Sequence, residues 1–377
     1  TFDLFAGGAN SYALGPLADQ GFSSSSNGFG GFPNSSSNSQ DAFAGYVDLE
    51  GDITDALTLG AAVRYEDYSN FGDTLNYKVA ALYKVNDNVR LRGTYSTGFH
   101  APTGGQANIT NVTTQNVNGQ LVDQGTLPLN TAAGQLAADF IQSTTGERPT
   151  LTAEDARNIS LGMAFNTGGI NWTVDYFNID VKDRVALGAN IDFLDALQAA
   201  GATAGTIGGA LTELDAAGTI SRTDFVGLDD LAQFRFFSNA FDTKTQGIDI
   251  KGDYNFEMAG GDSTIIVAAN WTDTEVTRQG PISAGRVQSL EDLLPNVKGS
   301  ATLLHSKGIW NGMLRANYYG KWDDTGNGVD GVSSEIMIDA EIGAEVYEGV
   351  ELMIGANNIF DNYPDENPGK GGSGQLY

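Results

Sequence analysis

The chain has 377 residues, about two to three times the usual length of one domain, so it forms either several domains or one large repetitive architecture. It carries 20 Lys and Arg against 47 Asp and Glu, a formal net charge of −27, which argues against a nucleic-acid partner because no large basic surface can be assembled. The absence of Cys excludes disulfides, thiolate metal sites and thiol nucleophiles.

Alternation of apolar and polar residues predicts about twelve β-strands. In the first of them, Phe43, Val47 and Leu49 alternate with the acidic Asp48 and Glu50. The predicted strands begin near residues 43 and 57 and then cover 77–85, 89–97, 159–165, 170–176, 234–254, 265–271, 297–304, 310–318, 336–346 and 350–356. No apolar run exceeds roughly five residues, which excludes a membrane-spanning helix of about 20 residues but not the weaker signal of membrane strands.

The connections between these strands alternate in length. The short ones are 54–56, 86–88, 167–169, 257–262, 306–309 and 348–349, and the others, mostly long, are 69–76, 99–153, 184–231, 274–296 and 321–334. A soluble sandwich mixes turn lengths at both ends, whereas an outer-membrane barrel has short periplasmic turns and long outer loops. The sequence therefore predicts an all-β fold, an antiparallel transmembrane β-barrel. Residues 131–143 and 192–200 are predicted to form short helices within two loops.

Strand parity assigns each side chain to one of two faces. Val63 and Leu314 are predicted to face lipid, and Arg64 and Arg315 the lumen or a plug. Trp271, Trp310 and Tyr318 fall on apolar faces near strand ends, where an interfacial aromatic girdle is expected. The polar face is predicted to combine acids with bases, namely Asp48, Glu50, Glu335, Asp339 and Glu341 with Arg64, Arg90 and Arg92.

Four segments resemble those of the TonB-dependent receptors, which import scarce nutrients across the Gram-negative outer membrane. Leu-Arg-Gly-Thr-Tyr-Ser-Thr-Gly-Phe-His-Ala-Pro-Thr, from Leu91, resembles the strand before the family's Phe-Arg-Ala-Pro box, with His100 in place of Arg. The segment from Leu151 is similar to the Leu-Thr-Pro-Glu segment, and that from Phe236 to a strand ending in a Gly-Val-Asp-like motif. Gly-Ala-Asn-Asn-Ile-Phe-Asp-Asn-Tyr-Pro-Asp, from Gly355, resembles the motif of the penultimate strand. All four occur in family order.

The resemblance implies a 22-stranded barrel filled by an amino-terminal plug, of which this chain would supply about 12 strands, similar to strands 10 to 21. On this basis residues 1–42 are expected to be an extracellular loop. Residues 43–365 are expected to be barrel strands with extracellular loops at 99–153, 184–231, 274–296 and 321–334. Residues 366–377 would form a further extracellular loop before a missing last strand. The plug and the segment that contacts TonB are not expected within this chain.

The implied function is TonB-energised import, with the ligand captured by extracellular loops, and not enzymatic catalysis. The implied surroundings are the Gram-negative outer membrane with its lipid and lipopolysaccharide, and the TonB complex acting through the missing plug. No cofactor and no nucleic acid is implied. Iron chelates, cobalamin and oligosaccharides remain open as the nutrient ligand, and the acidity favours neutral, cationic or metal-borne solutes. A passive porin-like channel and a soluble β-rich adhesin are the alternatives.

The candidate ligand-binding residues lie near the outer ends of strands and in long loops. They are Tyr68, Phe71, His100, Trp322 and Asp324. Aromatic rings at such positions stack on sugar or chelate faces, and acids orient hydroxyls or cations. Ordinary loop packing is the alternative for each residue singly.

Metal binding has weaker support in the sequence. Neither His100 nor His305 has a second His or an acid at a metal-binding helical spacing, and residues 106–153 contain no His of the kind that haem receptors use. Asp323, Thr325 and Asn327, with Gly328, match positions one, three, five and six of a calcium loop. Ser334 stands where position twelve requires Glu, so a solvated turn is the favoured interpretation.

Overall fold

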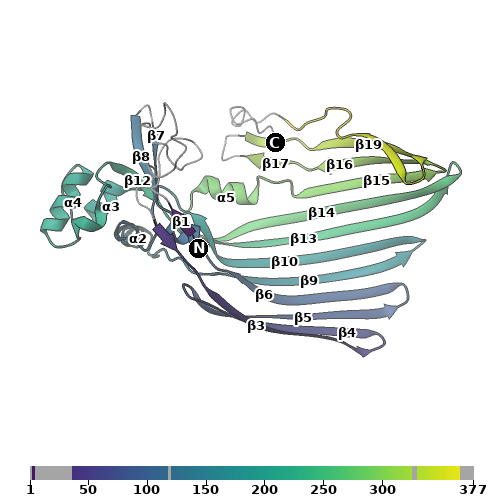
Figure 1. Cartoon of the computed structure of the whole chain (residues 1–377), viewed down its shortest axis with the longest axis horizontal. Helices are drawn as coiled ribbons and strands as arrows, with labels where there is room; N and C mark the ends of the chain where they lie inside the picture. The colour runs from purple at the N-terminus through teal and green to yellow at the C-terminus, as the bar shows by residue number, and fades with distance from the viewer. Residues whose placement is uncertain (1, 5–35, 118–119, 325–328, 366–377) are drawn as a thin grey trace.

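The computed structural model describes residues 2–4, 36–117, 120–324 and 329–365. Twelve antiparallel strands form one sheet in which every strand pairs with its neighbours along the chain, in the order β20-β19-β16-β15-β14-β13-β10-β9-β6-β5-β4-β3. Figure 1 shows these strands side by side along the long axis of the molecule. The predicted all-β antiparallel fold with twelve strands is confirmed. Within the described residues the sheet is open, with β3 and β20 at its two edges.

The strands are longer than the alternation predicts. Their bounds are β3 Ala42–Thr54, β4 Leu57–Tyr68, β5 Gly72–Asn86, β6 Val89–His100, β9 Glu154–Thr167, β10 Ile170–Leu187, β13 Phe237–Met258, β14 Gly261–Gln279, β15 Val297–Lys307, β16 Trp310–Tyr319, β19 Glu335–Tyr347 and β20 Val350–Ala356. No helix among the described residues is long and apolar enough to cross a membrane.

Six turns of two residues each join strands at one end of the sheet, at 55–56, 87–88, 168–169, 259–260, 308–309 and 348–349. They lie at the right-hand end of Figure 1. Gly168 and Gly169 have φ of 61° and 81°, and Ala259 and Gly260 have φ of 52° and 74°. Positive φ at both positions is the type I′ geometry, whose twist matches that of the strands. The predicted short connections are thus confirmed.

The connection predicted at residues 69–76 is shorter than expected. Strand β5 begins at Gly72, so only residues 69–71 join β4 to β5, and Asn76 pairs with Arg64 inside the ladder. Gly72 has φ of 81°, a conformation that a residue without Cβ adopts at little cost, and this allows the chain to turn back early. The alternation missed this stretch because Asp73, Thr74 and Asn76 are polar on both faces.

The long connections gather at the other end, at the left of Figure 1, which we call the outer end of the strands. We call residues 101–153 and 188–236 the cap. Its elements are α1 Gly104–Asn108, β7 Asn111–Val117, β8 Gln120–Thr126, α2 Ala132–Thr145, β11 Ile191–Asp192, α3 Phe193–Ala199, α4 Ile207–Ala216, η2 Arg222–Phe225 and β12 Leu231–Arg235. Outside the cap lie β1 Phe2–Leu4, β2 Ser36–Asn38, α5 Ala284–Glu291, β17 Trp322–Asp324 and β18 Val329–Val332.

Both predicted helices are present in the cap. Helix α2 begins after Thr131, whose hydroxyl accepts a hydrogen bond from the Gly134 N–H, and ends at Gly146, which has φ of 85°. Helix α3 begins after Asp192, whose carboxylate accepts from the Asp195 N–H. These caps satisfy backbone groups that the helix itself leaves unpaired.

The single strand predicted for 234–254 is wrong, because the chain breaks at Phe236. Phe234 belongs to β12, which pairs in parallel with β8 inside the cap, whereas β13 begins at Phe237. The ring of Phe234 is fully buried against Phe193, with ring centroids 5.3 Å apart. Burial of this aromatic ring in the cap stabilises the break.

The main hydrophobic core of the described residues lies in the cap and not beneath the sheet. It gathers Phe193, Leu211, Phe225 and Phe234 around α2, α3 and α4. The sheet leaves its own apolar side chains open, among them Leu161 at 59% exposure. A strand surface of this kind is suited to lipid, because lipid covers it in place of a second protein layer.

Pairing registers divide the sheet into an apolar face and a polar face. One apolar row crosses ten strands through Leu57, Tyr83, Leu91, Met163, Val174, Ile250, Ala269, Gly299, Tyr318 and Ile336. The corresponding polar row runs through Thr58, Leu82, Arg92, Gly162, Asp175, Asp249, Asn270, Lys298, Tyr319 and Glu335. Val63 and Leu314 lie on the apolar face, and Arg64 and Arg315 on the polar face, as predicted.

The apolar face carries the expected aromatic side chains. Trp271, Trp310 and Tyr318 are all on it and exposed. The ring of Trp172 covers Gly252 on the next strand, where a Cβ would lie 2.6 Å from the indole. Glycine is needed there because only it allows so close an approach of the ring to the backbone.

Candidate functional site

Asn239, at the start of β13, ties the cap to the sheet. Its Oδ1 accepts from the Thr152 N–H at 2.7 Å, and its Nδ2 donates to the carbonyls of Thr152 at 3.0 Å and Asp183 at 2.6 Å. The side chain is 6% exposed. Since a buried amide must be paired, this residue fixes the chain leaving the cap against the outer end of β10.

Arg278 adds an ionic contact beside this amide. Its guanidinium donates to Asp183 and Asp242 at 2.9 Å each, and Glu147 lies 4.0 Å away. The outer ends of β10, β13 and β14 are therefore held together by charge as well as by backbone pairing.

A cavity of about 680 Å³ lies at the outer end of the polar face, which we call the rim cavity. Its floor includes Lys298 of β15, Tyr319 of β16 and Glu335 of β19, which are direct neighbours in one cross-strand row. Trp322 of β17 and Leu294, from the loop after α5, line its walls. The two loops after β14 and β16 thus close over the ends of three adjacent strands.

The segment after β20 completes the wall with Asn358, Tyr363 and Pro364. Asn358 has φ of 48°; its Nδ2 donates to the Asn362 carbonyl at 2.7 Å and its Oδ1 accepts from the Asn362 N–H at 3.1 Å. Asp339 of β19 accepts from the Asn358 N–H at 2.9 Å. The Asn-Asn-Ile-Phe-Asp-Asn-Tyr motif therefore forms a turn that is fastened to β19 and presents Tyr363 to the cavity.

The rim cavity has the character of a small-molecule site. Two tyrosines, a tryptophan and Leu294 supply stacking and apolar contact, while Lys298, Glu335 and Asn358 supply a cation, a carboxylate and an amide. Such sites are mostly apolar, with few polar groups that set the orientation of the ligand. A rigid ring system with a few hydrogen-bonding groups fits this combination.

The predicted ligand-binding residues do not converge on one place in the described sheet. Trp322 lines the rim cavity, and Asp324, on the same short strand, is only 2% exposed. Tyr68, Phe71 and His100 belong instead to the outer ends of β4, β5 and β6, and five strands separate β6 from β16. Their role in binding stays a prediction.

These three residues have local partners. Tyr68 packs edge to face on Phe99, with ring centroids 5.4 Å apart, and its hydroxyl donates to Glu66 at 3.4 Å. Phe71 is half-buried in the turn before β5. His100 Nδ1 lies 3.9 Å from the Glu154 carboxylate. Loop packing accounts for these contacts without a ligand.

The calcium hypothesis falls partly outside the described residues, because Thr325 and Asn327 are not among them. Asp323 accepts a hydrogen bond from the Gly331 N–H, and its own N–H donates to the Asp292 carbonyl at 3.0 Å. Burial, with Glu291 and Asp323 nearby, raises the pKa of Asp292. No cluster of three or more potential metal ligands occurs in the described ranges, and calcium binding stays a prediction.

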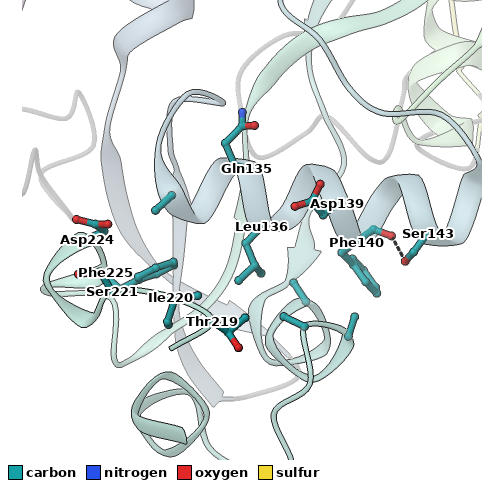
Figure 2. Close-up of a pocket in the computed structure, with 14 residues that line it drawn as sticks. Gln135, Leu136, Asp139, Phe140, Ser143, Thr219, Ile220, Ser221, Asp224 and Phe225 are labelled. Atoms are coloured by element: carbon teal, nitrogen blue, oxygen red, sulfur yellow. Dashed lines mark hydrogen bonds between the residues drawn. The ribbon is translucent and has the colours of Figure 1, made fainter. Parts of the chain in front are cut away.

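A second cavity, of about 530 Å³, lies in the cap between α2, α3 and residues 219–225. Figure 2 shows Leu136 and Phe140 of α2 facing Ile220 and Phe225 across it. Asp139 at its edge is already paired with Arg148. Because this groove is confined to the cap and does not reach the polar face, the rim cavity is the better candidate for a solute that enters the barrel.

Residues 1–359 match the family described as TonB dependent receptor-like, beta-barrel. The chain belongs to this family. The members of this family are outer-membrane receptors and transporters of Gram-negative bacteria, and not enzymes. Membership of an outer-membrane family counts against the soluble adhesin. No curated protein matched the chain.

Solved TonB-dependent receptors share the fold at low identity. The ferric enterobactin receptor of Pseudomonas aeruginosa in complex with BCV-L6 is 16% identical, with a TM-score of 0.59 over 87% of this chain and 41% of that chain. The siderophore receptor PirA of Acinetobacter baumannii is 15% identical, with a TM-score of 0.56 over 86% and 42%. PirA of P. aeruginosa is 13% identical, with a TM-score of 0.53 over 86% and 46%. The chain therefore spans less than half the length of these receptors.

Sequence reasoning missed most of the rim cavity. It singled out Trp322 and placed Glu335 on the polar face. It did not identify Lys298, Tyr319 or Tyr363 as residues that face the ligand. Strand parity together with distance from the short turns would have brought Lys298, Tyr319 and Glu335 to the same height on one face.

Proposed function

We propose that the chain is the barrel portion of an active outer-membrane importer, energised by TonB through a plug, which captures a scarce nutrient at the rim cavity. One observation carries the proposal: the cavity opens on the polar face, which in this barrel family surrounds the lumen, and it lies at the end with the long loops. A solute bound there is already on the path into the barrel.

The residues of the cavity favour a ligand with a ring or another flat apolar surface and low negative charge. Lys298 is the one basic residue among its described lining residues, and the whole chain carries a net charge of −27. Solved neighbours that are named as siderophore receptors support an iron chelate. Cobalamin and an oligosaccharide also meet the requirement for rings and few charges.

Whole-cell uptake by the protein at its full natural length tests the proposal. We expect accumulation of the nutrient to require an intact TonB system. The double variant Tyr319→Ala with Trp322→Ala should weaken binding about fivefold or more, since each lost ring contact contributes roughly 0.5–1.5 kcal/mol. Trp271→Ala is the matched control, because Trp271 lies on the opposite face, paired with Val297 at the start of β15. Unchanged binding in the double variant would remove the rim cavity as the site.

The porin alternative has its own readout. A passive channel of this size would show steady single-channel conductance in planar bilayers and uptake without TonB. A plugged importer would show neither. Steady conductance, together with uptake that does not need TonB, would establish the porin-like channel instead.

A further inference from the structure

The inner end of the apolar face, next to the two-residue turns, holds two basic side chains among apolar neighbours. His305 and Lys307 both lie on β15, on the same face as Leu303. In the turn-side halves of the twelve described strands, no other Asp, Glu, Lys, Arg or His lies on this face. Because a charged group on a lipid-facing surface is costly, this pair calls for a partner.

Small residues lie beside the two bases. The cross-strand row through His305 has Ser263 on one side and Gly312 on the other. Lys307 pairs with Trp310 on β16, and Gly261 of β14 lies on its other side. A Cβ added at Gly312 would meet no side chain within 4 Å. A Cβ added at Gly261 would lie 2.9 Å from both His305 Cε1 and Lys307 Cβ, so these side chains lean over that glycine. We call the surface formed by His305 and Lys307 with Gly261, Ser263, Gly312 and Trp310 the inner notch.

Each of the two basic side chains makes one hydrogen bond within the protein and keeps at least one further polar atom that can bind a ligand. Lys307 Nζ donates to the Ala259 carbonyl in the β13–β14 turn at 2.7 Å, and an ammonium group has three N–H donors. His305 Nδ1 lies 2.8 Å from Ser263 Oγ, which leaves Nε2 as the second polar atom of the ring. An acceptor with several oxygens, such as a phosphate group, can bind both bases at once.

Exposed apolar side chains continue from the notch toward the middle of the sheet. Leu314 is 50% exposed and Ile342 is 55% exposed, both within two residues of the notch in register, and Trp310 at its edge is 56% exposed. Tyr254 and Phe256 stack on its other side with ring centroids 5.6 Å apart. Aromatic rings beside a basic group, with an apolar surface above them, match the profile of a lipid from headgroup to acyl chain.

We propose that the inner notch binds a phospholipid of the periplasmic leaflet, with the headgroup phosphate on Lys307 and His305 and the acyl chains along Leu303, Leu314 and Ile342. The proposal rests on the membrane location in the proposed function, but not on TonB or on the nutrient. The commitment to a phospholipid over free phosphate follows from the exposed apolar rows next to the bases. Trp310 marks the level at which the headgroup meets the acyl chains.

Native mass spectrometry of the receptor at its full natural length tests this site. The purified protein is incubated in detergent with phosphatidylglycerol, with diacylglycerol, which has the chains but no phosphate, or with glycerol phosphate, which has the phosphate but no chains. We expect the receptor to retain one phosphatidylglycerol and to bind both other compounds more weakly. Lys307→Gln should lower the affinity for phosphatidylglycerol about fivefold, because one basic residue near the membrane surface contributes about 1 kcal/mol to lipid binding. The double variant His305→Gln with Lys307→Gln should lose the retained lipid.

The controls separate headgroup binding from misfolding and from transport. Lys84→Gln makes the same charge change near another short turn but on the polar face, and should leave lipid binding unchanged. Lys307→Arg should restore it. Retention of the lipid in the double variant, equal binding of diacylglycerol, or tighter binding of glycerol phosphate would each overturn the proposal. If the wild-type receptor retains the lipid but shows no TonB-dependent uptake of the nutrient, that result counts against the proposed function and leaves the lipid site standing.

Discussion

The guanidinium of Arg92 on β6 reaches across β9 and binds the carboxylate of Asp175 on β10, with Nε 2.8 Å from Oδ1. The two side chains meet above Gly162, where a Cβ would lie 2.0 Å from Asp175 Oδ1 and 2.7 Å from Arg92 Nε. A glycine on the middle strand is thus required for an ion pair between strands that are not neighbours. This contact locks three strands of the polar face together.

Gly162→Ala should therefore destabilise the barrel by about 1–3 kcal/mol, the usual cost of forcing an added group into a filled space. The measurement is the temperature at which the unheated receptor loses its compact migration in SDS gels. Gly51→Ala is the matched control, since a Cβ at Gly51 of β3 meets nothing within 4 Å. If both variants shift this temperature equally, the contact above Gly162 does not stabilise the sheet.

Strand parity predicts opposite outcomes at adjacent residues of β16. Leu314→Arg, on the apolar face, should cost roughly 2–4 kcal/mol near the middle of the membrane, whereas Met313→Arg, on the polar face, should be tolerated. The assay is the yield of folded receptor in membranes. Cysteine labelling provides a second check, because Arg64→Cys should react with a water-soluble maleimide and Val63→Cys should not. The reverse labelling pattern would contradict the assigned faces.

Replacing the amide of Asn239 should loosen the cap before the barrel. Asn239→Leu leaves the Thr152 N–H and the Asp183 carbonyl without their partners, each at a cost of about 1–3 kcal/mol. Limited proteolysis should then cleave within the cap at lower protease concentrations, while the strands stay protected. Asn178→Leu serves as the comparison, because its amide makes only a 3.5 Å contact with Tyr176. Equal cleavage of the two variants would exclude Asn239 as the anchor.

Acid should weaken the turn between α3 and α4 in the cap. The N–H and hydroxyl of Thr203 and the N–H of Ala204 bind the Glu213 carboxylate and lower its pKa. Because the pKa of Glu213 is lower in the folded protein, its carboxylate stabilises the turn fully at pH values above its pKa in the unfolded chain, about 4.3. This stabilisation is lost as the pH falls through the pKa of Glu213 in the folded protein. The hydrogen-exchange protection factors of residues 202–206, which are corrected for the slower intrinsic exchange in acid, should fall between roughly pH 5 and pH 3.

Glu213→Gln should abolish most of that pH dependence, and Asp230→Asn, an exposed change elsewhere in the same loop, should preserve it. A wild-type profile that stays flat over this range would refute the assignment to Glu213.

The repeating part of the fold is accessible from the sequence, whereas in the cap only helices α2 and α3 are, and not the way in which its segments pack. Each strand carries its own alternation, so Val63 and Arg64 are assigned to faces by local pattern alone. In the cap, β12 pairs in parallel with β8 across about a hundred residues, and Phe234 is buried there only because Phe193 and Phe225 come from other segments. No local period encodes such a contact. For this reason the local pattern assigns Phe234 to the wrong strand.

The same distinction holds at the candidate site. Trp322 was found from its place in an outer loop, but the cavity that it lines also needs Lys298, Glu335 and Tyr363, which lie on separate segments of the chain. Tyr68 and His100 satisfy the same local criterion, but five strands separate β6, which carries His100, from β16, and seven separate β4, which carries Tyr68. A rule based on loop position selects the correct end of the barrel, but it cannot select the correct side of it.

The cap has a hydrophobic core of its own, whose buried residues lie within 127–141 and 191–236, and polar contacts such as those of Asn239 join it to the sheet. Exchange of residues 101–153 together with 188–236 between related receptors would therefore leave the strand pairing and both faces of the sheet intact. Chimaeric receptors could be assembled from one barrel and several caps. For the same reason, a sequence change inside the cap core needs no compensating change in the strands of the sheet.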